Sequence, residues 1–251
     1  MGTTYSRDTP GDVSNVIFEN AEPNIFDVSK DVDCERDWKF HADTGVLPAS
    51  TSLRMNLPRK YESDIQYSSI SYALAYVISY EAVTLFRPSV EFIDKTMKSL
   101  CVNTPVSSRM AIKTVQKFGV CEETEYSDDN GFPSKECLLK AHNFNRLGYF
   151  KIKFETIKKS VCMGYPVVLC IEIFNNNQIG EDVIKPPPDD STSLGSIAII
   201  VTGFDDRSNS FEYINCVKSE WGNCDYSIIK KYGHSMWVVK NAKYEDILEI
   251  V

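Results

Sequence analysis

Cysteine, serine and histidine are the residues of this sequence whose side chains could carry out nucleophilic chemistry. A histidine next to a cysteine or a serine would serve as the base of an acyl-transfer reaction. The chain has three histidines, His41, His142 and His234. Its eight cysteines are at positions 34, 101, 121, 137, 162, 170, 216 and 224. None of them forms a C-x-x-C pair, so we expect no zinc site and no cofactor.

The cysteines differ in their surroundings. Cys170 lies in the apolar run VVLCIEIF and is expected to be a small buried side chain. Cys34, Cys137 and Cys224 lie in polar stretches and are candidates for cross-links between chains. The start of the sequence lacks the apolar core of a signal peptide, and no apolar run has the length of a membrane span. We therefore expect synthesis inside the cell, where thiols stay reduced.

Composition narrows the class of partner. The chain has 251 residues, of which 43% are hydrophobic and 25% are charged, as in an ordinary globular protein. The net charge is −8, which argues against nucleic acid and anionic membranes as partners.

The first half of the sequence is expected to be helical. Residues 68–86, SSISYALAYVISYEAVTLF, are apolar on nearly every face, begin with a serine cluster that could cap a helix, and end before Pro88. This pattern predicts a buried central helix. Residues 89–98, 108–118 and 136–147 are predicted to form further helices, the second of them ended by Gly119.

The second half is rich in strand-forming residues. Strands are predicted at 166–174, 196–204, 210–217 and 236–240, with a proline-rich loop at 180–193 between the first two. Helices followed by strands predict an α+β fold with an antiparallel β half. The expected division is a polar N-terminal arm at 1–51, a helical half at 52–150 and a β half at 151–251.

The order of several short motifs resembles that of the compact papain-like (C1-type) cysteine proteases of bacteria and viruses. Their nucleophile motif, D-Q-G-x-L-G-S-C-T-A-x-A, aligns without gaps with Asp64-Ile65-Gln66-Tyr67-Ser68-Ser69-Ile70-Ser71-Tyr72-Ala73-Leu74-Ala75. Further matching segments are Phe118-Gly119-Val120-Cys121, Gly164-Tyr165-Pro166-Val167-Val168, Gly203-Phe204-Asp205-Asp206 and Trp221-Gly222. The resemblance covers residues 52–240 and implies a papain-like fold.

The resemblance also implies four catalytic positions: a cysteine nucleophile, a histidine base, an asparagine that orients the histidine, and a glutamine that binds the oxyanion. Ser71 stands at the nucleophile position and Ile65 at that of the glutamine. Ile197, in Gly195-Ser196-Ile197-Ala198, replaces the histidine, and Asn215 remains. The sequence therefore predicts a degenerate protease that is not an enzyme, with a cleft filled by Ile65 and Ile197.

Three functions follow from this interpretation. The first is a structural protein that assembles with itself, similar to the polyhedrin matrix proteins of nudiviruses, which form occlusion bodies around virions in infected cells. The alternative is a binding module that acts as an inhibitor or adaptor of another protease. The third is a serine hydrolase that uses Ser71.

Overall fold

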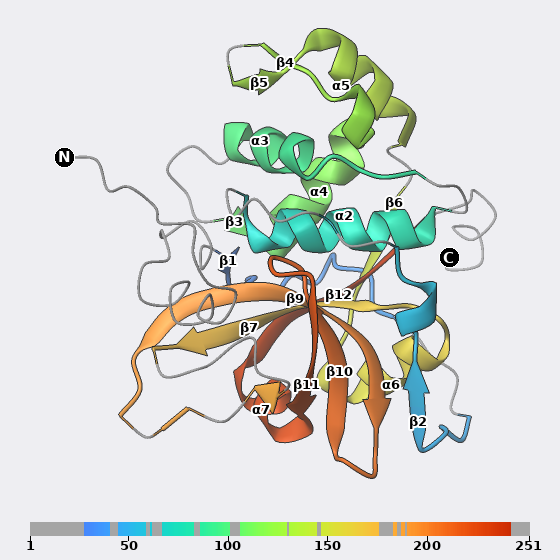
Figure 1. Cartoon of the computed structure of the whole chain (residues 1–251), viewed down its shortest axis with the longest axis vertical. Coiled ribbons are helices and arrows are strands. Elements are labelled where there is room, and N and C mark those ends of the chain that lie inside the picture. Colours follow the sequence, from blue (N-terminus) through green and yellow to red (C-terminus); the bar gives the residue numbers. More distant parts are fainter. Residues whose placement is uncertain are drawn as a thin grey trace, which may run out of the picture.

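The computed structural model describes residues 28–40, 45–58, 61, 67–82, 86–100, 106–129, 131–144, 147–175, 183–184, 187–188 and 190–241. A layer of helices lies on one face of a large curved sheet (Figure 1). Two short helices, α6 (Ile157–Cys162) and α7 (Tyr226–Tyr232), cover the opposite face. The sheet thus separates two hydrophobic cores, an upper core under the helical layer and a lower core beneath the sheet.

The central helix α2 (Ser69–Glu81) is buried along its first ten residues, as the apolar stretch predicts. It ends five residues earlier than expected, because Ala82 has an extended backbone with ψ 118°. The Ser79 hydroxyl donates a hydrogen bond to the carbonyl of Phe86 (2.9 Å) and holds the chain where it turns away. Helix α2 packs against the sheet and so holds the helical layer on it (Figure 1).

Three further helices complete the upper layer: α3 (Val90–Leu100), α4 (Ser108–Phe118) and α5 (Lys135–Ala141). Serine side chains cap α4 and α5, and α4 ends at Gly119 (φ 78°), as expected. The predicted helix at 136–147 is too long. After α5 the chain makes one 3₁₀ turn (His142–Phe144) and then enters the sheet as β6 (Leu147–Lys151), because Leu147 pairs with Asn241.

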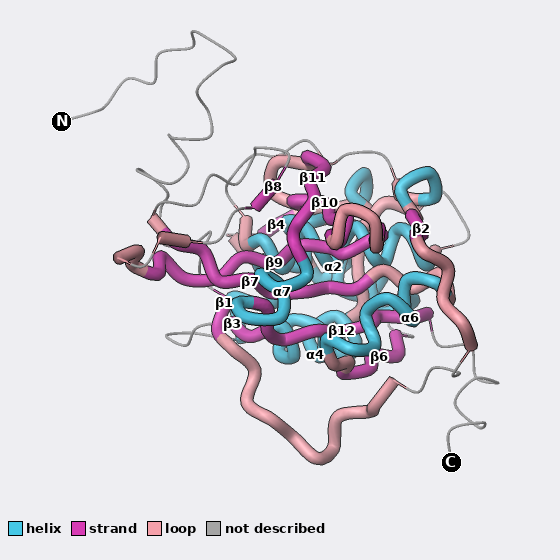
Figure 2. The backbone as a smooth tube through the Cα atoms, turned by 90° about the horizontal axis from the view of Figure 1, so that it is seen from below, coloured by secondary structure: helices cyan, strands magenta, loops and turns pink. Residues whose placement is uncertain are grey.

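The main sheet has the strand order β6-β12-β7-β9-β10-β11-β8 (Figure 2). Its remaining strands are β7 (Val167–Phe174), β8 (Val183–Ile184), β9 (Ser193–Asp205), β10 (Ser210–Asn215), β11 (Glu220–Asp225) and β12 (Gly233–Asn241). All pairs are antiparallel except β11 with β8. The four predicted strands are present, which confirms the α+β class. The part of the loop 180–193 that the structure describes contains β8.

The sequence prediction missed several elements. β6 and β11 have short sequences, LGYFK and EWGNCD, in which apolar and polar residues do not alternate clearly. The smaller described elements are β1 (Val28–Ser29), β2 (Ser50–Ser52), β3 (Val106–Ser107), β4 (Asp128–Asp129), β5 (Phe132–Pro133), and the 3₁₀ turns Arg54–Asn56, Glu123–Glu125 and Phe154–Thr156. None of the described helices has the length and apolarity to cross a membrane.

The two faces of β9 decide where its side chains point. Ala198 and Ile200 belong to the upper core under α2, whereas Ile197 and Ile199 belong to the lower core. This alternation is the ordinary consequence of strand geometry. Ile197 therefore points away from α2.

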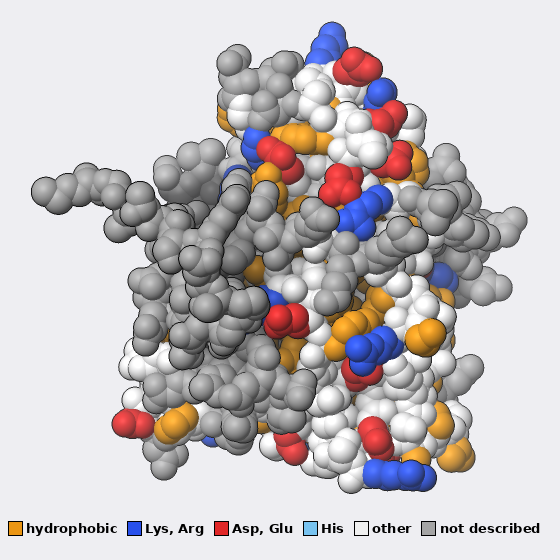
Figure 3. Space-filling model, viewed as in Figure 1, with side chains coloured by type: hydrophobic (Ala, Val, Ile, Leu, Met, Phe, Trp, Pro, Cys, Tyr) orange, Lys and Arg blue, Asp and Glu red, His pale blue; other side chains and the backbone are white. Residues whose placement is uncertain are grey.

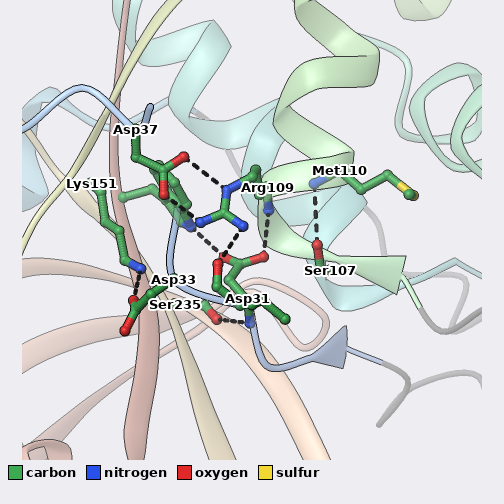
Figure 4. Close-up of polar contacts among 10 residues, drawn as sticks. Asp31, Asp33, Asp37, Ser107, Arg109, Met110, Lys151 and Ser235 are labelled. Atoms are coloured by element: carbon green, nitrogen blue, oxygen red, sulfur yellow. Dashed lines mark hydrogen bonds and ion pairs between the residues drawn. The ribbon is translucent and has the colours of Figure 1, made fainter. Parts of the chain in front are cut away.

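Residues 28–40 lie against α4, β6 and β12, and acidic side chains hold them there. We call Asp31, Asp33 and Asp37, together with their partners Arg109 and Lys151, the arm clamp (Figure 4). The Asp37 carboxylate accepts hydrogen bonds from Nε (2.9 Å) and Nη2 of Arg109. Lys151 Nζ lies 2.5 Å from Oδ1 of the exposed Asp33.

Asp31 links the arm clamp to β12 as well as to α4. Its Oδ1 accepts from the backbone N–H of Arg109 (3.0 Å), and its Oδ2 accepts from Nε1 of the buried Trp237 (2.8 Å). Its own backbone N–H donates to the Ser235 hydroxyl (2.9 Å). The described end of the N-terminal arm is thus fixed to β12 at two neighbouring positions.

Candidate functional site

Ser71, the residue at the nucleophile position, lies in the first turn of α2 and is fully buried. Its hydroxyl donates to Asp94 Oδ1 (3.2 Å), and its backbone N–H donates to the carbonyl of Ser68 (3.0 Å). Lys98 Nζ lies 2.6 Å from the other oxygen of Asp94. The Ser71 hydroxyl is therefore held by a buried carboxylate and not by a histidine.

The other positions of the motif do not converge on Ser71. Asn215 is buried, and its Oδ1 accepts from the backbone N–H groups of Val217 (3.1 Å) and Lys218 (3.4 Å), so this side chain caps the turn after β10. Ile197 packs into the lower core, on the face of the sheet opposite α2. Ile65 lies outside the described residues. The sequence predicted that Ile65 and Ile197 fill the cleft. The structure does not support this for Ile197, the one of the two that it describes.

One histidine is brought to the sheet face under α2. His234 lies within β12, one residue after its start, and pairs with Cys170 of β7, which pairs in turn with Ala198 of β9. Residues directly opposite in antiparallel strands share a face. Because Cys170 and Ala198 belong to the upper core, His234 lies on that face as well.

The His234 ring joins two serines. Nε2 is 2.8 Å from Oγ of Ser196, and Nδ1 is 3.0 Å from Oγ of Ser235. A serine hydroxyl in contact with an imidazole nitrogen, with the other nitrogen held by a third group, is the arrangement that activates a serine nucleophile. We call the serine and the histidine of the 2.8 Å contact the Ser196–His234 pair.

Irregular backbone flanks both members of the pair. The β7–β9 ladder shifts register beside Gly195, whose φ is 123°, and the β12–β7 ladder shifts between His234 and Trp237. Ser235 has a φ of 50°, which is unusual for a residue other than glycine. Bulges and left-handed residues are common beside active sites, where they aim side chains.

The pair lies at the N-terminal end of α2. The backbone N–H of Ala198 donates to the hydroxyl of Ser69, the first residue of α2 (2.9 Å). Ser196 is two residues away along β9, a distance of about 7 Å along an extended strand. The first residue of α4, Ser108, touches Cys170 through their side chains (2.9 Å). The N-termini of α2 and α4 therefore both meet the sheet near the Ser196–His234 pair.

Burial and neighbouring charges set the protonation of His234. Its pKa is lowered from the ordinary value of 6.5, mainly by burial and next by the charge of Lys30, while Asp31 and Glu172 oppose the shift. The imidazole is thus neutral at pH 7 and can accept a proton. Ser196 is buried, at 8% exposure, whereas His234 is partly exposed.

His142 does not join this site. His142 lies in the 3₁₀ turn after α5, and His41 lies outside the described residues. Within the described part of the chain, no group of three or more potential ligands is arranged to hold a metal ion.

The structure also places the cysteines predicted to cross-link chains. Cys137 and Cys224 are buried, at 1% and 0% exposure, so the folded chain does not offer them to a neighbour. Their polar sequence neighbours point outward, while the cysteines themselves face the cores. Cys34 is partly exposed, and Cys170 is buried as expected.

Comparisons with known proteins identify the fold. No model of a protein family matches the sequence. A peptidase C1-like protein of Acanthamoeba polyphaga mimivirus is 24% identical over 204 residues, which are 69% of this chain and 65% of the relative. The chain therefore spans less than two thirds of that relative's length.

Solved structures give the same class. Xylellain, a cysteine protease from Xylella fastidiosa, matches with a TM-score of 0.74 and 20% identity, covering 86% of this chain and 96% of xylellain. A procathepsin B from Trypanosoma congolense matches with a TM-score of 0.63 and 12% identity, covering 93% and 91%. The chain has the papain-like fold of C1 cysteine proteases, as the motifs predict.

These comparisons correct one prediction. The sequence led us to expect that the protein is not an enzyme, but the proteins with this fold are cysteine proteases and the viral relative is named a peptidase. The findings thus point to a protease. The prediction rested on the replacements at the aligned motif positions and on the judgement that none of the three histidines joins a site. It did not foresee that β12 brings His234 to Ser196, the residue directly before Ile197.

Proposed function

We propose that the protein is a serine-type hydrolase on a papain-like fold, which cleaves polypeptides with Ser196 as nucleophile and His234 as base. The observation that carries this proposal is the 2.8 Å contact between Ser196 Oγ and His234 Nε2 at the sheet end near α2. The names of its relatives support a peptide substrate.

The tautomer of His234 decides whether it can act. When Nδ1 carries the proton and donates to Ser235 Oγ, Nε2 has a free lone pair and accepts from the Ser196 hydroxyl. The Ser235 oxygen already accepts from the backbone N–H of Asp31, which leaves a second lone pair for the imidazole. Ser235 therefore orients the ring as the third member of the site.

The reaction follows from these contacts. Ser196 Oγ forms a bond to the carbonyl carbon of the substrate while His234 Nε2 takes the hydroxyl proton. The tetrahedral intermediate then collapses, the C–N bond breaks, and the imidazolium gives its proton to the leaving amine. Water, activated by the same nitrogen, hydrolyses the acyl ester and restores the Ser196 hydroxyl.

The surroundings support negative charge in the transition state. The N-terminus of α2, where Ser69 binds Ala198, carries the positive end of a helix dipole.

The view in Figure 3 shows acidic and basic side chains interspersed on the described surface, with no large area of a single sign.

Labelling with a fluorophosphonate tests this proposal, since the reagent reacts with activated serines. We expect one adduct per chain, located on Ser196 by fragmentation of the tryptic peptides, and no adduct in the Ser196→Ala variant. An adduct on Ser71 would support the hydrolase that the sequence suggested instead. A native protein that takes up no more label than the heat-denatured one would contradict both.

Self-assembly is a second candidate function, and polyhedrin of nudiviruses is its predicted form. Two apolar side chains of the described arm support it, since Val32 is 80% and Trp38 is 44% exposed beside the arm clamp. A partner in such an assembly would be a second copy of the chain, with virions as the enclosed particle and an occlusion body in an infected cell as the location. Sedimentation of the purified protein should then show higher oligomers that Trp38→Ser weakens. A monomer at all concentrations would remove this candidate.

A further inference from the structure

Two buried cysteines of the upper layer lie side by side. Cys121 follows α4 and Cys137 lies in the first turn of α5, and both are thiols with 1% exposure. Cys137 is the first neighbouring side chain that acts on the Cys121 thiol, and the Cys121 thiol itself donates to the carbonyl of Glu122 (3.4 Å).

The backbone holds the two segments together. Gly119 has a φ of 78°, and a Cβ at this position would lie 1.8 Å from the carbonyl oxygen of Ala141. Ala141 and Cys137 are one helical turn apart on the same face of α5. That face therefore meets residues 119–121 at two points, with Ala141 against Gly119 and Cys137 against Cys121.

Both segments are also fixed to the rest of the helical layer. The carbonyl of Cys121 accepts from the backbone N–H of Ser89 (2.8 Å). Cys137 donates its backbone N–H to the Ser134 hydroxyl that caps α5 (3.2 Å). Cys137 is thus placed by a capped helix and Cys121 by a backbone hydrogen bond to Ser89, and a disulfide between them requires that the sulfurs approach to about 2 Å.

We propose that Cys121 and Cys137 are an oxidative modification site, where an intramolecular disulfide fastens α5 to the segment after α4. A glutathione disulfide can serve as oxidant. One cysteine thiolate attacks a glutathione sulfur and releases one glutathione, and the second cysteine attacks the mixed disulfide and releases another. The two cysteine thiols lose two electrons and two protons. The glutathione disulfide receives them and becomes two glutathione thiols.

The bond closes a loop between positions 121 and 137, which contains the β4–β5 hairpin. Closing a loop of this size restricts the unfolded chain. The reaction is slow in the folded protein, because burial and the neighbouring Cys137 raise the pKa of Cys121 to about 12. Oxidation therefore requires transient exposure of the two thiols to the oxidant.

Mass spectrometry of the full chain incubated with oxidised glutathione tests the site. We expect a loss of 2 Da and, after trypsin digestion without reduction, a cross-link between peptides 118–135 and 136–140. The oxidised protein should unfold roughly 5–10 °C higher than the reduced one. Dithiothreitol should reverse both changes.

Two matched variants separate this disulfide from general thiol oxidation. Cys137→Ala should abolish the cross-link and the difference in unfolding temperature between oxidised and reduced samples. Cys224→Ala, at an equally buried cysteine, should keep both. The proposal fails if the native chain only acquires glutathione adducts, if other cysteines pair instead, or if the oxidant leaves both peptides unlinked. These outcomes do not depend on hydrolase activity.

Discussion

Ser196→Ala is expected to lower kcat/KM for polypeptide hydrolysis by at least about a thousandfold, and His234→Gln by about 10²- to 10⁴-fold. Alanine removes the oxygen that attacks the substrate. Glutamine fills similar space, but it cannot take the proton that His234 Nε2 accepts at 2.8 Å. The double variant should be no worse than the more severe single variant, because the two residues act in one step. Initial rates on a quenched fluorescent peptide library measure these effects.

The pH profile gives a second readout for the same pair. Burial and Lys30 lower the pKa of His234, whereas Asp31 and Glu172 act in the other direction. The acidic limb of kcat/KM should therefore lie below pH 6.5, where the imidazole becomes protonated. The sign for stability agrees: the unfolded chain binds this proton more readily, so acidification from about pH 6.5 should destabilise the fold. His234→Gln should remove this contribution.

Two control variants keep the test specific. His142→Gln changes a histidine in the 3₁₀ turn after α5, and Ser71→Ala removes the hydroxyl bound to Asp94. Both should retain the activity of the unmodified protein, with circular dichroism confirming the fold. Full activity in Ser196→Ala would rule out our assignment, and loss of activity in Ser71→Ala alone would return the nucleophile to the start of α2.

Arg109→Met should lower the free energy of unfolding by about 3 kcal/mol. The guanidinium makes two hydrogen bonds to Asp37, whose side chain is 4% exposed, and a third to the carbonyl of Val32. It also lies over the Trp237 ring, 5.5 Å from its centroid. Methionine leaves the buried carboxylate without a partner, which costs more than the lost attraction. Urea unfolding followed by tryptophan fluorescence measures the change.

The exposed ion pair of the arm clamp provides a matched control for the buried one. Lys151→Met removes the pair with Asp33, whose side chain is fully exposed, and should cost less than about 1 kcal/mol. Adding Asp37→Asn to Arg109→Met should recover part of the lost stability, because the unpaired charge disappears. Equal losses in Arg109→Met and Lys151→Met would show that the buried pair does not hold the arm.

The fold could be predicted from the sequence where one pattern dominates. The apolar stretch of α2 and the β-branched runs of β7 and β9 are buried on both sides, so their composition alone indicates their place. β6 and β11 escaped prediction because partner strands, and not their own side chains, determine their conformation. Helix α2 ended early for a similar reason, since a hydrogen bond from Ser79 to Phe86 redirects the chain.

The candidate site was less predictable. Aligned motifs placed Ser71 and Asn215 on the correct elements, but they gave no information about side-chain partners such as Asp94 or the turn after β10. The contact between Ser196 and His234 depends on the register of three strands, including two bulges. Register between distant segments leaves no local signature in the sequence.

The arm clamp links two properties that are usually separate. Asp31 holds the N-terminal arm through its carboxylate, and its backbone N–H fixes the hydroxyl of Ser235, which in turn contacts His234. The contacts that dock the arm therefore also stabilise the orientation of the imidazole. A ligand that binds at the His234 ring and favours its present orientation must therefore also strengthen the docking of the arm. By thermodynamic linkage, a docked arm strengthens the binding of that ligand by the same factor.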